Sequence, residues 1–507
     1  MWLRVLITIS LFSSYGLSYK AAVVEYYPQT ADTPQETIRK NIDEYRQYAD
    51  RAKDQSVNIV VFPEYGLTTL VQDPEEYALE INNSTQVIID LSNMAKERQL
   101  YLVVNLLEKE TTGTETMYYN TNLVFDKSGT IILKYRKINL YDERRLTPGA
   151  KDQILTFKTD FGATFGIFTC FDILYNHPSR TVLQNSEVTD IVFPTAWIST
   201  MPFHTSLSVQ HGYAASTGVN LLAANYGKPQ DGRGGSGIYA ADGKNPEMYV
   251  ADSASTKFVV RELASIKTRH DVTMCLTRTP FGLPSNISKS NVSDYVTQRL
   301  FDASNYQTQS IDLSQNYTET MICDRDFCCT FEILVNSTNS SEIYKLVAFD
   351  GIVSYDRTNP EATQAHIRVC SLVACEDETL DSCGARINGT TKFTKITVKG
   401  NLPADNTSFY SPVTVNSYLL PVRDAAFCDT KNGTNSTFVE LTTVRAQENV
   451  LVFGLFGRTD APIPKENPDD PNDGSDGSDG SDGSAGSNIH ATLCFLVFSL
   501  AMKFIVS

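Results

Sequence analysis

The chain has 507 residues, which is enough for more than one domain and for a large hydrophobic core. Its formal net charge of −16 at pH 7 argues against nucleic-acid binding, because that function needs a basic surface. The net charge leaves the fold class open.

The N-terminal residues have the features of a secretory signal peptide. Arg4 supplies a positive charge, a short apolar segment follows, and Gly16 and Ser18 are small residues after it. The apolar segment is shorter than the about 20 residues that a membrane-spanning helix needs. We therefore expect residues 1–18 to be cleaved and the chain to enter the secretory pathway.

Residues 19–285 alternate between predicted strands and predicted helices. The first helix is expected to begin at Thr33-Pro34, because apolar residues then recur every three or four positions. Several strands are apolar on both faces, which indicates an α/β fold with helices covering a sheet. The predicted strands span residues 21–26, 58–62, 101–107, 117–125, 130–137, 163–169, 190–194, 219–225 and 235–239, and the predicted helices span residues 33–52, 85–97 and 204–217.

Cys170 lies where one of these strands ends and the chain turns, before a helix-like run. Such a position exposes the side chain at the edge of a sheet and leaves backbone N–H groups free nearby, which suits a nucleophile. The alternative interpretation is a buried cysteine that packs as a small apolar side chain.

Glu64 and Lys137 also follow or end predicted strands. The active sites of open α/β sheets lie at the carboxyl ends of strands, so these side chains are expected to meet Cys170. A carboxylate, an amine and a thiol form a set suited to acyl transfer. Taken singly, Glu64 is typical of a helix start, and Lys137 and Glu143 are typical of exposed charges.

Three histidines and one tryptophan offer further candidates. A Cys–His pair with His177, His204 or His211 is an alternative catalytic arrangement. His177 follows the candidate nucleophile and either lines a substrate pocket or belongs to a structural loop. Trp197 is either a pocket wall or part of the core.

Residues 286–460 are predicted to form a smaller, β-rich second domain. Eight cysteines that belong to this half of the chain or lie just before it form an even set, which predicts four disulfides in an oxidising compartment. Their pairing is left open. A zinc site at the first cluster is disfavoured, because it lacks a C-x-x-C spacing and a nearby histidine. The eight are Cys275, Cys323, Cys328, Cys329, Cys370, Cys375, Cys383 and Cys428.

N-glycosylation sequons concentrate in the same half of the chain, and each predicts an exposed asparagine. The acceptors are Asn82, Asn83, Asn286, Asn291, Asn316, Asn336, Asn339, Asn388, Asn406, Asn432 and Asn435.

The C-terminal residues are typical of a glycosylphosphatidylinositol (GPI) anchor signal. Residues 461–487 form an Asp/Gly/Ser-rich linker, and residues 488–507 form a mostly apolar propeptide that would be removed. Ser484 is the predicted attachment residue. The anchor would hold the protein on the outer leaflet of the plasma membrane. The alternative is a C-terminal membrane helix.

Three motifs resemble the Glu–Lys–Cys motifs of the nitrilase (carbon–nitrogen hydrolase) superfamily, and most closely its vanin/biotinidase branch. They are Phe62-Pro-Glu64-Tyr-Gly, Tyr135-Arg-Lys137-Ile-Asn-Leu and Gly166-Ile-Phe-Thr-Cys170-Phe-Asp172-Ile-Leu. Ile191-Val-Phe-Pro-Thr-Ala-Trp197 and Gly235-Ser-Gly-Ile-Tyr239 resemble the same branch. The resemblance covers roughly residues 20–460, and its strongest part is the segment around Cys170. It implies a four-layer α-β-β-α sandwich with a β-rich, disulfide-linked C-terminal domain.

The resemblance also implies roles for residues of this chain. Glu64 would be the proton acceptor, Cys170 the nucleophile, and Lys137 the proton donor that also stabilises the oxyanion. Glu143 would hold Lys137 in place, and the backbone N–H of Phe171 would contact the substrate. No metal or cofactor is needed for this chemistry.

The implied reaction is hydrolysis of a linear amide through a thioester. Pantetheine is the favoured substrate, with pantothenate and cysteamine as products. A biotinyl amide is the alternative substrate. A GPI-anchored binding or adhesion glycoprotein without activity is the alternative of another class.

Overall fold

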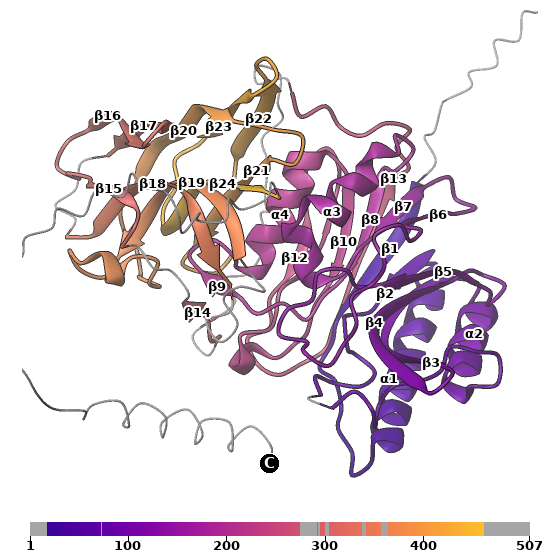
Figure 1. Ribbon diagram of the computed structural model, residues 1–507. Helices are drawn as coiled ribbons and strands as arrows, with labels where there is room; N and C mark the ends of the chain where they lie inside the picture. The colour runs from indigo at the N-terminus through magenta and orange to yellow at the C-terminus, as the bar shows by residue number, and fades with distance from the viewer. Residues whose placement is uncertain are drawn as a thin grey trace, which may run out of the picture. The chain divides into compact units, whose positions relative to one another are not determined.

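A computed structural model describes residues 18–71, 73–273, 292, 295–299, 304–336, 341–355 and 364–460 (Figure 1). Residues 1–17 of the predicted signal peptide, the linker, the anchor site at Ser484 and the propeptide lie outside the described residues, whereas Ser18 is described and begins the first strand. Asn286, Asn291, Asn339 and Cys275 also lie outside them, as does the predicted boundary at residue 285.

The first sheet has six strands, in the order β13-β1-β2-β3-β4-β5. β1, β2 and β3 are parallel, as an α/β pattern predicts, whereas β13 and β4 pair antiparallel with their neighbours. The strands are β1 (Ser18–Glu25), β2 (Ile59–Val61), β3 (Tyr101–Thr112), β4 (Glu115–Phe125), β5 (Ile131–Arg136) and β13 (Lys257–Ala264).

Helices α1 (Pro34–Asp54) and α2 (Gln86–Arg98) pack against this sheet through one apolar core. α1 begins where the sequence predicts, because the Thr33 hydroxyl accepts a hydrogen bond from the Glu36 N–H and a proline follows Thr33. Its buried residues include Ile38, Ile42 and Tyr45. Their three- and four-residue spacing gives the helix a single apolar face.

The second sheet also has six strands, in the order β12-β11-β10-β8-β7-β6. It shares a core with the first sheet, to which Val23 and Val61 of one sheet and Phe165 and Leu221 of the other contribute. Its strands are β6 (Thr156–Lys158), β7 (Thr164–Ile167), β8 (Asp190–Pro194), β10 (Asn220–Ala224), β11 (Ser236–Tyr239) and β12 (Glu247–Tyr249).

α4 (Ser206–Thr217) packs against the second sheet and completes the α-β-β-α layers that the resemblance implies (Figure 1). The helix-like run after Cys170 is broken into the 3₁₀ turns η1 (Cys170–Leu174) and η2 (Thr181–Gln184) and the short α3 (Asn176–Ser179). The break has a local cause: Pro178 disfavours the helical conformation of His177, whose φ and ψ are −106° and 120°. A further 3₁₀ turn, η3, spans Pro229–Asp231.

The C-terminal region is a sandwich of two five-stranded antiparallel sheets, as the composition predicts. Burial alternates along β17, where Cys329, Phe331 and Ile333 face the core. One sheet has the order β15-β18-β19-β24-β21, and the other has the order β16-β17-β20-β23-β22. The strands are β15 (Gln307–Ser310), β16 (Tyr317–Asp324), β17 (Phe327–Val335), β18 (Ile343–Ser354), β19 (Gln364–Cys375), β20 (Phe393–Pro403), β21 (Phe409–Asn416), β22 (Ala425–Lys431), β23 (Ser436–Thr443) and β24 (Val450–Thr459).

The sandwich contacts the α/β layers mainly where β21 lies on α4. Gly212 of α4 is required there, because a Cβ atom at this position would lie 2.4 Å from the carbonyl oxygen of Pro412. The Ser208 hydroxyl accepts a hydrogen bond from the N–H of Thr414 at 3.1 Å. A small parallel pair, β9 (Thr200–Met201) with β14 (Gln298–Arg299), adds a second connection.

Three disulfides lie among the described residues, and they give the pairing of six of the eight cysteines. They join Cys323 to Cys328, Cys329 to Cys370, and Cys375 to Cys383. Cys428 is also disulfide-bonded. The zinc alternative at residues 323–329 is wrong, because all three of its sulfurs are in disulfides.

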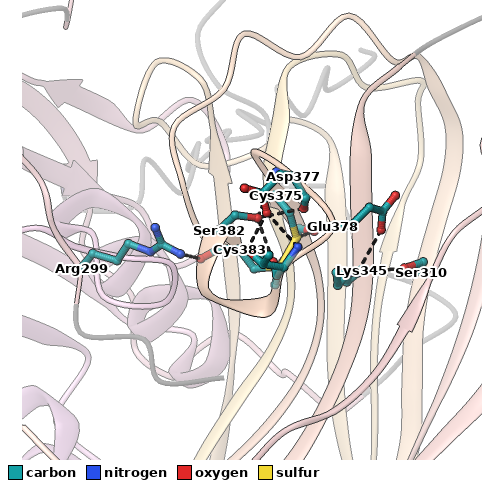
Figure 2. The surroundings of a disulfide bond; sticks show 10 residues. Arg299, Ser310, Lys345, Cys375, Asp377, Glu378, Ser382 and Cys383 are labelled. Carbon is teal, nitrogen blue, oxygen red and sulfur yellow. Dashed lines mark hydrogen bonds and ion pairs between the residues drawn. A yellow bond between two sulfur atoms is a disulfide. The ribbon is translucent and has the colours of Figure 1, made fainter. Parts of the chain in front are cut away.

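The Cys375–Cys383 disulfide closes a short loop that ends in η5 (Leu380–Ser382). Figure 2 shows that Arg299 approaches this loop, and its guanidinium donates to the Cys383 carbonyl oxygen at 2.9 Å. Nearby, the Lys345 ammonium donates to Ser310 at 2.9 Å and lies 3.4 Å from Glu378 (Figure 2). The disulfide therefore fixes a polar surface loop at the end of β19.

The sequons that fall on described residues have exposed asparagines, as predicted: Asn82, Asn83, Asn316, Asn336, Asn388, Asn406, Asn432 and Asn435. None of the helices within the described residues is long and apolar enough to cross a membrane.

The Cys329–Cys370 disulfide joins the two sheets of the sandwich and closes a loop of 41 residues. Replacing both cysteines by alanine should lower the free energy of unfolding by about 4 kcal/mol, because the unfolded chain regains loop entropy. Urea unfolding of the purified protein measures this loss. The matched control is alanine at Cys323 and Cys328, whose five-residue separation predicts a loss of only about 2 kcal/mol. Equal losses in the two variants would contradict the loop-length explanation.

Candidate active site

Three predicted site residues follow the carboxyl ends of strands, as expected. Glu64 comes three residues after β2, Lys137 directly follows β5, and Cys170 comes three residues after β7. β5 runs parallel to β2, because each is connected to β3 by the parallel and antiparallel pairings of the first sheet. Glu64 and Lys137 therefore lie at the same edge of that sheet.

The Lys137 ammonium lies between two carboxylates. Its Nζ is 2.8 Å from Oε1 of Glu64 and 2.8 Å from Oε2 of Glu143. Burial by itself would lower the pKa of Lys137, but the charges of Glu143 and Glu64 outweigh it and raise that pKa well above its usual value. The amine therefore stays cationic. An ammonium has three N–H donors, so one remains for a substrate after these two bonds.

Asn120, on β4, connects the same two carboxylates from the other side. Its amide nitrogen donates to Glu64 at 2.7 Å and to Glu143 at 2.8 Å. The Asn120 oxygen accepts from Asn105 at 2.6 Å, and Asn105 also donates to Asn122 at 2.8 Å. These three asparagines are buried in strands that are otherwise largely apolar. They hold the carboxylates at fixed positions.

Glu143 is fixed from several directions. It accepts hydrogen bonds from the Tyr65 hydroxyl and from the N–H of Tyr141. Burial alone would raise the pKa of Glu143, but the Lys137 charge and the hydrogen bonds from Lys137, Tyr65 and Asn120 lower it below its usual value. Glu143 is therefore ionised and forms an ion pair with Lys137.

Glu64 has one oxygen on Asn120 and Lys137, and its other oxygen accepts from the backbone N–H of Ala196 at 2.8 Å. Ala196 follows β8 in the second sheet, so Glu64 bridges the two sheets. Only 1% of this residue is exposed. Glu64 is thus a carboxylate whose position is set from both sides of the site.

Cys170 is the free cysteine among the described residues, and it is half-buried. It starts η1 with a φ of 46°, a conformation that is rare for residues other than glycine and recurs at nucleophile turns. Burial and the Glu64 charge raise its pKa to about 12, although Lys137 acts in the opposite direction. The resting group is therefore a thiol that needs a base.

The turn after Cys170 is held by Asp172. Its carboxylate accepts from the Tyr135 hydroxyl at 2.6 Å, from Asn139 at 2.8 Å and from the N–H of Thr169 at 3.1 Å. The backbone N–H of Phe171 has no acceptor among the described residues. It is therefore available to a substrate oxygen near Cys170.

The histidines are less suited to act as the base. Burial lowers the pKa of His204 to about 3 and that of His211 to about 4, so both are weak proton acceptors at neutral pH. His177 contacts Thr181, with its Nδ1 2.8 Å from the hydroxyl oxygen. The groups that shift the pKa of Cys170 include Glu64 and Lys137.

Trp197 belongs to the core between the two sheets and is 7% exposed. Its indole N–H donates to the His204 carbonyl oxygen at 2.8 Å. It thereby fixes the loop between β8 and α4. The core interpretation of this residue fits its burial, and its contact with a substrate stays a prediction.

The site thus combines a thiol, a carboxylate whose charge acts on that thiol, and an ammonium fixed between two carboxylates. Such a set can deprotonate the thiol, stabilise an oxyanion and form a thioester with an acyl group. Within the described residues, no group of three or more potential metal ligands comes together.

Family models cover both halves of the chain. Residues 20–245 match the carbon–nitrogen hydrolase model, and residues 295–462 match the vanin C-terminal domain model. The chain belongs to the carbon–nitrogen hydrolases of the vanin type. As a member of this family, it is a hydrolase of carbon–nitrogen bonds.

Relatives of this carbon–nitrogen hydrolase are similar over most of its length. A vanin-like protein 1 from Drosophila melanogaster is 27% identical, covering 90% of each chain. The pantetheinase of Homo sapiens is 28% identical, over 72% of this chain and 74% of the relative. The biotinidase of Homo sapiens is 29% identical, over 75% of this chain and 77% of the relative. An amidase structure from Nesterenkonia sp. is 21% identical with a TM-score of 0.40, over 49% of this chain and 90% of that one.

Sequence reasoning missed the residues that hold the charged groups in place. Asn105, Asn120 and Asn122 carried a signal, because they interrupt strands that are otherwise apolar. Buried polar side chains need partners, so such interruptions indicate a hydrogen-bond network. Tyr65 and the N–H of Ala196 gave no comparable signal.

Replacing Glu64 by glutamine should make the Cys170 thiol easier to ionise and yet slow the hydrolysis of an amide. Loss of the carboxylate removes a charge that raises the thiol pKa, so the midpoint of alkylation by iodoacetamide should move to lower pH. Amide hydrolysis should nevertheless fall by about 10²- to 10⁴-fold, because the variant loses the carboxylate that the resemblance assigns as the general base. Mass spectrometry of the Cys170 peptide across a pH series gives the midpoint.

The control is Glu108→Gln, which removes a buried carboxylate that pairs with Arg136 and Lys134 instead. This variant should keep the alkylation midpoint of the parent. A midpoint that stays the same or rises in Glu64→Gln would contradict the arrangement described for Cys170.

Proposed function

We propose that this protein hydrolyses a linear amide through a thioester on Cys170, with Glu64 as the base. The observation that carries the proposal is the Lys137 ammonium, which is fixed between Glu64 and Glu143 and whose charge acts on the Cys170 thiol. A thiol with a pKa of about 12 attacks only after a base removes its proton, and Glu64 is the carboxylate that acts on it.

In the first half-reaction, Glu64 takes the proton from the Cys170 sulfur as the sulfur attacks the amide carbonyl carbon. The carbonyl oxygen becomes an oxyanion, which the third N–H of Lys137 and the N–H of Phe171 stabilise. Loss of one such donor typically costs about 3 kcal/mol. The carbon–nitrogen bond then breaks, and the amine leaves with the proton that Glu64 returns through the Lys137 ammonium.

In the second half-reaction, Glu64 takes a proton from water, and the resulting hydroxide attacks the thioester carbonyl. The same two donors stabilise the second oxyanion. The carbon–sulfur bond breaks, Cys170 regains its proton, and the carboxylic acid leaves. The overall reaction consumes one amide and one water and yields one amine and one acid.

Pantetheine is the proposed substrate, and a biotinyl amide is the second candidate. Relatives named pantetheinase and biotinidase have nearly the same identity to this chain, 28% and 29%. The choice of pantetheine rests on the vanin-type C-terminal domain and on the predicted anchor tail. An inactive adhesion glycoprotein is the less favoured alternative, because such a protein would not need Glu64, Lys137 and Cys170 together in a buried site with balanced charges.

The substrate is tested with secreted protein truncated before Gly483. Pantetheine should be hydrolysed with a kcat/KM at least about tenfold above that of biocytin, a difference of about 1.4 kcal/mol in transition-state stabilisation. The Cys170→Ala variant should lose at least about 10³-fold in kcat, because no thioester forms. Equal rates for parent and variant would exclude the thiol mechanism. Intact mass after brief incubation with substrate would identify the acyl group on the parent protein.

We also propose that the protein is held on the cell surface by a GPI anchor at Ser484. The three disulfides among the described residues fit an oxidising compartment. The Asp/Gly/Ser-rich stretch before a terminal apolar segment fits an anchor signal.

Phosphatidylinositol-specific phospholipase C should release the enzyme from intact cells, because it cuts the anchor lipid and leaves the protein whole. Immunoblotting of medium and cell fractions measures the release. A Ser484→Leu variant tests the assigned residue, since a bulky side chain is not tolerated at the attachment position. Protein that stays on the cells after treatment would favour the C-terminal membrane helix instead.

A further inference from the structure

The ring of Phe171, which follows the candidate nucleophile, is surrounded by aromatic side chains from both parts of the structure. Its centroid lies 5.1 Å from that of Tyr141 and 5.2 Å from that of Tyr175. It also lies 5.4 Å from the ring of Tyr355, which directly follows β18 of the sandwich. Tyr355 packs against both the core of the α/β layers and the core of the sandwich.

Three polar atoms in this region are buried and have no hydrogen-bond partner among the described residues. They are the Tyr355 hydroxyl, Nε2 of His204 and Nη1 of Arg458. The rings of Tyr355 and His204 are 5.4 Å apart. The Arg458 guanidinium carbon lies 6.0 Å from the Tyr355 ring centroid and 3.7 Å from that of Tyr175. The three atoms therefore belong to one cluster, close to Phe171.

Unpartnered buried polar groups are costly, and each one typically forfeits about 1–3 kcal/mol. Three of them in one cluster indicate that a partner supplies the missing hydrogen bonds. The position of the cluster beside the residue after Cys170 indicates that this partner is the amide substrate.

The charge of the cluster defines what it can bind. Nε of Arg458 donates to Asp460 at 3.1 Å, so the guanidinium is already paired with one carboxylate. His204 is neutral at physiological pH, because burial and the Arg458 charge lower its pKa to about 3. The cluster thus offers a guanidinium N–H, a hydroxyl and a neutral imidazole, with no net charge left to balance. An uncharged group with hydrogen-bond acceptors fits it better than a carboxylate does.

We propose that Tyr355 and Arg458, together with His204, determine substrate specificity by binding an uncharged polar group of the amide substrate. A hydroxyl, a second amide or a ureido group has this chemistry. The inference rests on the proposed hydrolase function. It assigns to the C-terminal sandwich a direct part in substrate selection.

The test compares two amides that share one leaving amine. Pantetheine carries hydroxyls and a second amide, whereas N-hexanoylcysteamine has a plain alkyl chain. The ratio of kcat/KM for pantetheine to that for N-hexanoylcysteamine should fall about 5- to 10-fold in Tyr355→Phe and in Arg458→Lys, which is the loss of one hydrogen bond. The fall should appear mainly in KM for pantetheine.

Thermal unfolding separates this role from a structural one. Tyr355→Phe removes a hydroxyl without a partner, so its Tm should equal or exceed that of the parent. The control is Tyr344→Phe on β18, the strand that Tyr355 follows; the Tyr344 hydroxyl donates to the Val450 carbonyl oxygen at 2.9 Å. Tyr344→Phe should lower the Tm and leave the kcat/KM ratio unchanged. Two results would overturn the proposal. One is an unchanged ratio of the two kcat/KM values in Tyr355→Phe. The other is a lower Tm of this variant together with equal losses of kcat/KM for both amides.

Binding without turnover distinguishes this proposal from the hydrolase proposal. Calorimetry on Cys170→Ala protein should give a Kd for pantetheine that rises about 5- to 10-fold when Tyr355→Phe is added. This result would support the role of Tyr355 in substrate binding even if Cys170 proved not to be the nucleophile. Equal Kd values, or no binding of pantetheine to either protein, would overturn the assignment of the cluster whatever the outcome of the kinetic experiments.

Discussion

The buried ammonium of Lys137, held between Glu64 and Glu143, is the interaction on which the site depends. A cation can stay charged with 2% of its side chain exposed only when opposite charges and hydrogen bonds compensate the lost hydration. Removing one partner would leave an uncompensated buried charge, which typically costs about 3–5 kcal/mol. The arrangement therefore fixes the positions of the proposed base and of the proposed oxyanion donor at the same time.

The two facing sheets make this arrangement possible. Glu64 and Lys137 come from one sheet, Cys170 and the Ala196 N–H come from the other, and the shared core holds the two together. Asn120 then connects the two carboxylates from β4, where an apolar side chain would have left them without a donor. The site residues thus meet at the interface between the two sheets, and their relative positions depend on how that interface packs.

The sandwich is joined to these layers by specific contacts. α4 contacts β21 so closely that Gly212 has no room for a side chain. The guanidinium carbon of Arg180 lies 4.7 Å from the ring centroid of Tyr213 and 4.6 Å from that of Phe409, so cation–π contacts connect the two parts. Because Tyr355 reaches the ring of Phe171, the second domain contributes to the surroundings of the site as well as to stability.

The sequence by itself determined the alternation of strands and helices, the start of α1 at Thr33, the β-rich second domain and the strand-end positions of Glu64, Lys137 and Cys170. These features follow from local periodicity, capping and turn chemistry, which neighbouring residues set. Only the tertiary structure decided the three disulfides among the described residues, the asparagine network around Asn120 and the approach of Tyr355 to Phe171. Those contacts join residues far apart in the chain, so they depend on strand order and layer packing, which no local pattern encodes.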